Sequence, residues 1–220
     1  MQILTYGCSF TEYCLGTYAD ILSCDYHVVN RGRSGVGNDY ILFQIMEDYK
    51  KGITQDFDLT VIQWTGFTRW NYKTVSRWHG LDGSVYNTYN TESRTTWNTI
   101  KRFYNPVFEK EKFINNMILI NSLFKSANIP VVQLSYEKTD LDFINIDNIF
   151  EDYKGFYKFN PTSFSKEIWT DDHPTLMQHL EIASQIASVS KNTTKHVEKI
   201  HNLILEKKEF KDYTSHFSNR

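Results

Sequence analysis

The sequence predicts an α/β fold in which helices cover both faces of a mostly parallel β-sheet, as a three-layer sandwich. Short β-prone runs alternate with amphipathic segments of helical length from residue 2 to residue 65. The clearest strand, at 58–65, has a nearly continuous apolar centre, which is typical of a parallel strand buried on both faces. Turn-forming glycines follow the first two predicted strands, as expected in βαβ units.

Composition favours one domain and gives little indication of a charged partner. The chain has 220 residues, 40% of them hydrophobic, and a net charge of -2. That charge provides no general attraction for nucleic acid or an anionic membrane. Three cysteines, Cys8, Cys14 and Cys24, follow no metal-ligand spacing. Because we find neither a secretory leader nor a long apolar run, we expect a cytoplasmic protein.

The N-terminal stretch 3–11 has the pattern of a buried strand that runs into a tight turn. A helix is expected from about Glu12 to Ser23. Ser9 would then lie at the carboxyl end of the strand, with its N–H at a helix N-terminus. This position suits a nucleophile, because the same N–H can bind the oxyanion formed by attack. The alternative interpretation is that Ser9 only caps the helix.

Two further strands end in polar or glycine-rich sequence. A strand at 26–30 leads into the glycine-rich loop 31–39, and a helix follows at 39–51. The glycine spacing in this loop differs from G-x-G-x-x-G, which argues against a dinucleotide site. The loop is either a plain turn or a source of backbone N–H groups for a reacting centre. With Thr65 at the end of the third strand, three strand ends converge on one crevice.

The segment 66–107 interrupts the βαβ pattern and is rich in aromatic, Arg, Asn and Thr residues. A long insertion at this edge of a sheet is typically a lid or a binding wall. Its side chains suit sugars, nucleobases or an aromatic acyl group, and Arg69 and Trp70 are the candidate contacts nearest the end of the third strand that we single out. The alternative is that these aromatics form a small core of their own.

The rest of the chain returns to helix and strand patterns. We expect a helix at 109–127, a strand at 129–135, an acidic surface helix or irregular lobe at 140–153, a short strand somewhere in 155–168, and a helix at 174–190. Residues 191–220 are expected to form a C-terminal helix and a frayed tail. The domain prediction is therefore a single domain, 1–220, with an insertion at 66–107.

An acidic pair next to a histidine precedes the predicted helix at 174–190. Asp171, Asp172 and His173 have the composition of an oriented general base. An isolated Asp-His pair is also common as a helix cap.

Three of these motifs together resemble the SGNH (GDSL-like) hydrolase family, which has a flavodoxin-like fold. The stretch Gly7-Cys8-Ser9-Phe10-Thr11 resembles the family's first motif, and Asn30 to Gly35 resembles its second. Asp-x-His-Pro at 171–174 resembles the last. The resemblance implies that Ser9 is the nucleophile, that His173 is the base oriented by Asp171, and that Gly35 is an oxyanion donor. It is closest to compact members encoded by bacteriophages.

Two motifs depart from the family pattern. Cys8 stands where the family has Asp, and Thr65 stands where it has the oxyanion-binding Asn. Loss of one such donor costs about 3 kcal/mol, which Thr65, Gln63 or Arg69 would have to offset. The family's Asp lies three residues before the His, where this chain has Thr170, so Asp171 is preferred and Asp172 is the alternate.

The resemblance implies a serine esterase or O-deacetylase that forms an acyl-enzyme. Ser9, Gly35 and Thr65 would form the oxyanion hole, and Gln63, Arg69 and Trp70 would contact a small-molecule or glycan-type ester. No cofactor or metal is expected, and neither a membrane nor nucleic acid is an expected partner. Two alternatives stay open: an acyltransferase to a sugar or nucleoside hydroxyl, and a non-catalytic binding protein on the same scaffold.

Overall fold

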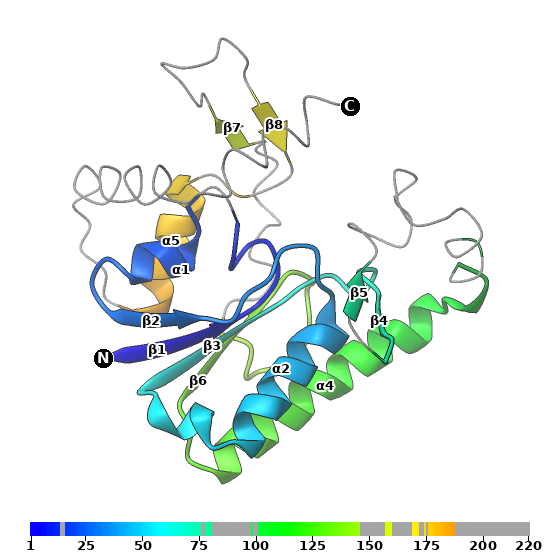
Figure 1. The fold of residues 1–220 in the computed structure, drawn as a ribbon, viewed down its shortest axis with the longest axis horizontal. Coiled ribbons are helices and arrows are strands. Elements are labelled where there is room, and N and C mark those ends of the chain that lie inside the picture. The colour runs from blue at the N-terminus through cyan, green and yellow to red at the C-terminus, as the bar shows by residue number, and fades with distance from the viewer. Residues whose placement is uncertain are drawn as a thin grey trace.

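The computed structural model is a three-layer α/β/α sandwich, which confirms the predicted fold class (Figure 1). It describes residues 1–13, 16–75, 78–80, 98, 101–145, 157–159, 169–171, 174 and 176–187. One four-stranded sheet lies at its centre, and helices pack on both faces of that sheet.

The central sheet is parallel throughout and has the strand order β2-β1-β3-β6. Its strands are β1 (Gln2–Tyr6), β2 (His27–Asn30), β3 (Leu59–Trp64) and β6 (Val131–Ser135). Ile3 pairs with Val28 on one side and with Leu59 on the other, which makes β1 an interior strand. The segment after β1 is therefore flanked by those after β2 and β3.

Each face of the sheet has its own apolar core. Alternating β1 and β3 side chains, among them Leu4, Tyr6 and Trp64, pack against α2 (Asn38–Lys50) and α4 (Pro106–Ser126). The intervening positions, Ile3 and Val61, pack against α1 (Tyr18–Leu22) and α5 (Leu176–Ile186). Figure 1 shows the two helix pairs on opposite sides of the sheet. Both faces are covered, which explains why apolar residues point to both faces of β1 and β3.

The first helix is much shorter than the sequence predicts. Among the described residues, the expected helix from Glu12 to Ser23 is observed over Tyr18–Leu22, and before it the Thr11 and Glu12 N–H groups donate to the Cys8 carbonyl in a single turn. The Thr17 N–H donates to the Asp20 carboxylate at 2.8 Å, which caps a separate helix beginning at Tyr18. This local capping overrides the helix-compatible sequence before it.

Segments beyond the central sheet differ from the expectations in detail. The insertion contains an antiparallel hairpin of β4 (Asn71–Lys73) and β5 (Trp78–Gly80). A short strand is present in 155–168, but β7 (Tyr157–Phe159) pairs with β8 (Trp169–Asp171) in a separate two-stranded sheet. A 3-10 helix, η1 (Ile53–Asp56), precedes β3. The predicted C-terminal helix and tail, 191–220, lie outside the described residues, as does most of the 140–153 segment.

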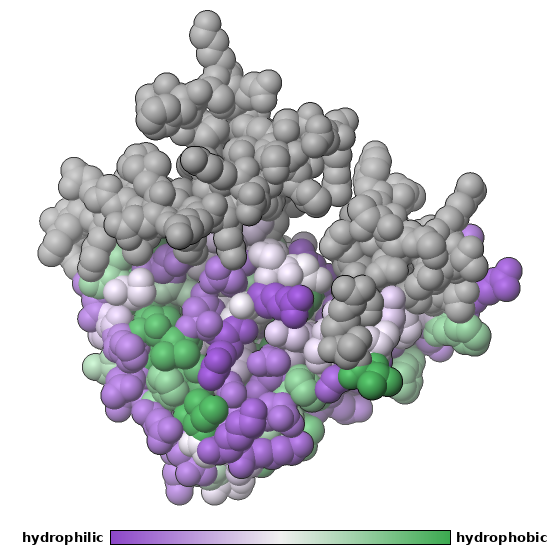
Figure 2. Space-filling model, in the orientation of Figure 1, coloured by the Kyte–Doolittle hydropathy of each residue, from purple (hydrophilic) through white to green (hydrophobic). Residues whose placement is uncertain are grey.

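The part of the surface formed by described residues is largely polar in this view. Among the coloured residues of Figure 2, hydrophilic side chains predominate, and apolar ones lie between them in patches. Within the described ranges, no helix is long and apolar enough to cross a membrane.

Candidate active site

Three predicted site residues lie at the same edge of the central sheet. Ser9 follows β1, Gly35 follows β2, and Thr65 directly follows β3. Because these strands are parallel and adjacent, their carboxyl ends meet at one edge, with Ser9 in the middle. Ser9 is 4% exposed and Thr65 is 1% exposed, so only a small part of either side chain reaches solvent.

The turn that carries Ser9 is held by Gln63, a side chain of β3. Gln63 Oε1 lies 3.3 Å from the Cys8 N–H nitrogen, 3.2 Å from Cys8 Sγ and 3.4 Å from Thr11 Oγ1, all of which can donate to it. Gln63 Nε2 donates to the Trp64 carbonyl at 2.6 Å. Gln63 is fully buried. It therefore holds the Ser9 turn through hydrogen bonds to Cys8 and Thr11. It has no exposed surface with which to contact a substrate.

A cation from the insertion lies next to the serine. Arg69 Nη1 donates to Ser9 Oγ at 3.4 Å, a long hydrogen bond that joins residues 60 positions apart. Ser9 Oγ also lies 4.0 Å from Cys8 Sγ. A guanidinium at this position favours negative charge on or near Oγ, which is the charge that develops during nucleophilic attack. Trp70, its neighbour in the chain, is partly buried.

Thr65 is fixed through its backbone. The Thr65 N–H donates to Asn38 Oδ1 at 2.9 Å, and Asn38 Nδ2 donates to the Thr65 carbonyl at 2.9 Å. This reciprocal pair ties the start of α2 to the end of β3. Since the N–H already has an acceptor, the oxyanion role predicted for Thr65 depends on its hydroxyl.

The loop after β2 is tied to the Ser9 turn by Asn30. Asn30 Oδ1 accepts from the Gly32 N–H at 2.8 Å, and Nδ2 donates to the Thr11 carbonyl at 2.8 Å and to Glu12 Oε2 at 2.9 Å. Gly35 has φ of 77°, in the left-handed region that favours glycine. The loop geometry therefore depends on both the Asn30 amide and the glycine.

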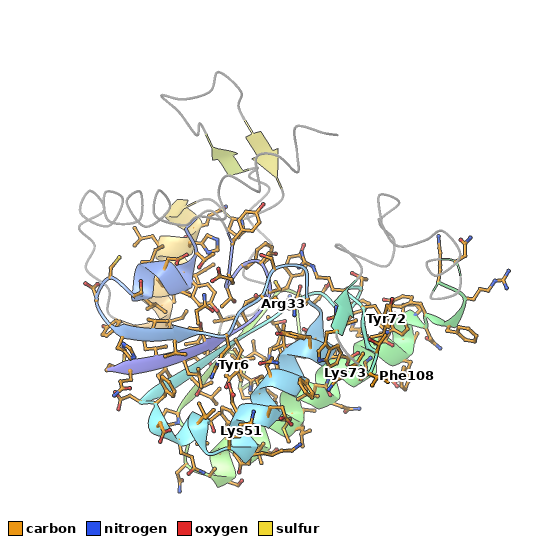
Figure 3. All side chains as sticks on the ribbon, viewed as in Figure 1. Tyr6, Arg33, Lys51, Tyr72, Lys73 and Phe108 are labelled. Carbon is orange, nitrogen blue, oxygen red and sulfur yellow. The ribbon has the colours of Figure 1, made fainter. Side chains whose placement is uncertain are left out.

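The insertion passes directly over the same loop. The Gly37 N–H donates to Asn71 Oδ1, and a Cβ added at Gly37 would lie 2.2 Å from the Arg69 carbonyl oxygen. A side chain at position 37 would therefore displace the segment that carries Arg69. Arg33 and Lys73 lie over aromatic rings of α2, 5.4 Å from the Tyr40 centroid and 4.0 Å from the Phe43 centroid, respectively (Figure 3).

The predicted acid-base pair is only partly described. Asp171 ends β8, where it pairs with Tyr157, so it lies at a strand end and not in the loop that the sequence suggests. His173 and Asp172 lie outside the described residues. The contact between Ser9 and His173 therefore stays a prediction.

Sequence reasoning missed the contribution of the fourth strand. Tyr136 and Glu137 follow β6 at the edge that carries Ser9, and the Tyr136 ring stacks on Phe10 at 5.8 Å. A Cβ added at Gly66 would lie 3.0 Å from Glu137 Oε1. Burial raises the pKa of Glu137 above its ordinary value, although the nearby Lys110 charge acts to lower it. The available signal was positional: a carboxylate two residues beyond a predicted parallel strand.

Across the part of the chain that the structure describes, no three His, Cys, Asp or Glu side chains are grouped so that they could hold a metal ion. Neither Ser9 nor Arg69 therefore adjoins a described cluster of potential metal ligands.

Comparison with known proteins yields one structural similarity. No protein-family model matches the chain, and no curated protein matches it either. Among solved structures, the chain is similar to that of a "putative acylhydrolase" from Bacteroides fragilis, with 14% identity, 90% of this chain and 88% of that one covered, and a TM-score of 0.36. A similarity at this level carries no argument about function, so the proposals below depend on the residues themselves.

Proposed function

We propose that this chain is a serine hydrolase that cleaves an ester, as an esterase or O-deacetylase, through an acyl-enzyme intermediate. The observation that carries the proposal is the surroundings of Ser9: a hydroxyl at the carboxyl end of an interior parallel strand, with the Arg69 guanidinium 3.4 Å away. Ligands of open parallel sheets bind at this edge.

In the proposed reaction, Ser9 Oγ attacks the ester carbonyl carbon while His173 takes the hydroxyl proton. Asp171 orients the imidazole, with Asp172 as the alternate. The Ser9 and Gly35 N–H groups and the Thr65 hydroxyl stabilise the oxyanion. Collapse of the tetrahedral intermediate breaks the bond to the alcohol, which leaves with the proton from His173. Water then attacks the acyl group by the same route and restores Ser9.

The Arg69 guanidinium supplies what the altered motifs lack. With Thr65 in place of an amide donor, the oxyanion loses a strong neutral hydrogen bond. A charged donor beside Ser9 Oγ offsets that loss, because charge-assisted hydrogen bonds are about twice as strong as neutral ones. Arg69 and Trp70 also border the substrate, whereas the buried Gln63 acts on it only through the Cys8 turn.

The test is covalent labelling by a fluorophosphonate probe followed by peptide mapping. We expect the label on Ser9 in the wild type, and no label in Ser9→Ala or His173→Gln. Ser23→Ala is the matched control, because Ser23 is exposed at the end of α1 and its hydroxyl donates to the Asp20 carbonyl. Labelling that persists in Ser9→Ala would contradict the proposal. An unlabelled but folded wild type would favour a binding protein.

A further inference from the structure

Arg69 is a cation whose backbone is fixed on both sides. Its N–H donates to the Gly66 carbonyl at 3.0 Å, and its own carbonyl oxygen packs against Gly37. Two residues further on, Asn71 Oδ1 accepts from the Gly37 N–H. The segment therefore holds Arg69 at the serine, where its guanidinium donates to Ser9 Oγ at 3.4 Å.

Among the residues that the structure describes, no carboxylate lies within ion-pair distance of the Arg69 guanidinium. The acidic side chains of the adjoining helices, Asp39 and Glu109, lie 3.0 Å and 2.5 Å from Lys112 Nζ instead. An arginine side chain carries five N–H donors, and one long hydrogen bond to Ser9 Oγ uses only one of them. Arg69, which is partly buried, therefore keeps donors for an anion from outside the chain.

A second arginine lies at the same turn. The Arg33 N–H donates to the carbonyl of Gly7, two residues before Ser9, at 3.0 Å. The exposed guanidinium of Arg33 (labelled in Figure 3) lies over the Tyr40 ring, 5.4 Å from its centroid, and has no described carboxylate as an ion-pair partner. The two loops that flank the Ser9 turn thus each contribute a cation, and both cations attract an anion to this edge of the sheet.

We infer that Arg69 binds a carboxylate of the substrate, so that the preferred esters are O-acetylated hydroxy acids, acidic sugars among them. The planar guanidinium fork matches the geometry of a carboxylate. Because the acetyl group removed by an O-deacetylase carries no charge, the carboxylate belongs to the alcohol part of the ester. The guanidinium then lies between the carboxylate and Ser9 Oγ, where its charge reduces the repulsion between the two. This substrate class rests on the proposed function for the reaction at Ser9.

The test compares acetoxyacetate with acetoxyacetamide, two acetate esters of nearly equal size in which a carboxylate stands in place of an amide. Arg69→Gln should lower kcat/KM for both esters, because the guanidinium also assists attack by Ser9. The ratio of kcat/KM for the anionic ester to that for the neutral ester should be about tenfold higher in the wild type than in Arg69→Gln, since the ratio in the variant corrects for the intrinsic reactivity of the two esters.

Arg102→Gln is the matched control, because Arg102 is an exposed arginine that precedes α4. We expect it to keep the wild-type ratio. The same ratio in the wild type and in Arg69→Gln, or an equal loss in Arg102→Gln, would overturn the carboxylate site.

A second readout needs no turnover. Glycolate and glycolamide, the alcohol products of the two esters, are titrated into the wild-type protein while the Nε–H signals of Arg69 and Arg102 are followed by NMR. Where neither ester is hydrolysed, this titration decides. A shift of the Arg69 signal by glycolate alone supports the carboxylate site while the proposed hydrolysis fails. An unmoved Arg69 signal, an equal response to glycolamide, or a shift no larger than that of Arg102 overturns the site as well.

Discussion

At the scale of single residues, the structure gives Ser9 a charged neighbour, Arg69, that its own turn does not supply. The hydroxyl lies against the Arg69 guanidinium on one side and Cys8 Sγ on the other. Cys8 is fully buried, and its thiol donates to the buried Gln63 amide oxygen. The geometry of Ser9 therefore depends on Gln63, a residue 54 positions away in the chain.

We predict that Gln63→Leu destabilises the protein and misplaces Ser9. The substitution leaves the Cys8 N–H without its buried acceptor, at a cost of about 1–3 kcal/mol in the free energy of unfolding, whereas the Thr11 hydroxyl keeps the Tyr18 hydroxyl as a partner at 2.9 Å. Urea denaturation measures that loss, and fluorophosphonate labelling of Ser9 should slow with it. Gln55→Leu, at an exposed glutamine of η1, is the control and should change neither quantity. A stable, fully labelled Gln63→Leu protein would show that the Ser9 turn holds itself.

At the scale of elements, asparagine side chains join the loops that surround Ser9. Asn30 ties the end of β2 to the turn after β1, Asn38 ties α2 to the end of β3, and Asn71 of β4 accepts from the loop before α2. Each amide bonds to backbone groups of another element. The loops at the carboxyl edge are therefore fixed to one another as well as to their own strands.

Two tryptophans of the insertion should behave differently on substitution. The Trp78 ring centroid lies 5.7 Å from that of Tyr40 and 5.4 Å from that of Phe43, both in α2, so we expect Trp78→Ala to lower the free energy of unfolding by about 3 kcal/mol.

Trp70 follows Arg69 at the candidate site, so we expect Trp70→Ala to lower kcat/KM for bulky polar esters about three- to tenfold with little loss of stability. Thermal unfolding and kinetics on acetylated sugars, acetylated nucleosides and a small activated ester measure these effects. If kcat/KM were unchanged for every substrate in Trp70→Ala, Trp70 would have only a packing role.

At the scale of the whole molecule, most of the stability lies in the two apolar cores, while charged groups add a dependence on pH. On the α2 side, the hydroxyl of Tyr6 (labelled in Figure 3) donates to Asp48 at 3.0 Å, and the Arg31 side chain lies 3.2 Å from the same carboxylate. Burial, reinforced by Asp48, raises the pKa of Tyr6. Tyr6 therefore stays protonated in the ordinary pH range and keeps its hydrogen bond to Asp48.

Glu137 should make the fold less stable as pH rises through the range just above the ordinary pKa of a glutamate. Its pKa is raised in the folded state, so the folded protein binds the proton more tightly than the unfolded chain does. Between the unfolded and the folded pKa, the free energy of unfolding therefore falls with increasing pH. Urea denaturation across that range should show a smaller fall in Glu137→Gln than in the wild type. Glu111→Gln, at an exposed glutamate of α4, is the control, and parallel curves for all three proteins would contradict the assignment.

The sequence by itself determined the fold class and most of the central elements, because helix and strand periodicities are local. The alternation of apolar strands and amphipathic helices predicted β1, β2, β3, β6, α2 and α4 within a few residues of their observed bounds. It also placed Ser9, Gly35 and Thr65 at strand ends, because a residue that follows a parallel strand lies at its carboxyl edge.

Only the tertiary structure decided which side chains act on these residues. The Arg69–Ser9, Asn38–Thr65 and Lys112–Asp39 contacts join positions 60, 27 and 73 residues apart, and no local pattern encodes them. The same limit made the first helix too long in the prediction, since the Thr17–Asp20 cap competes with a helix that the preceding residues also permit. Strand pairing, with β1 between β2 and β3, is what makes Ser9 the centre of the edge.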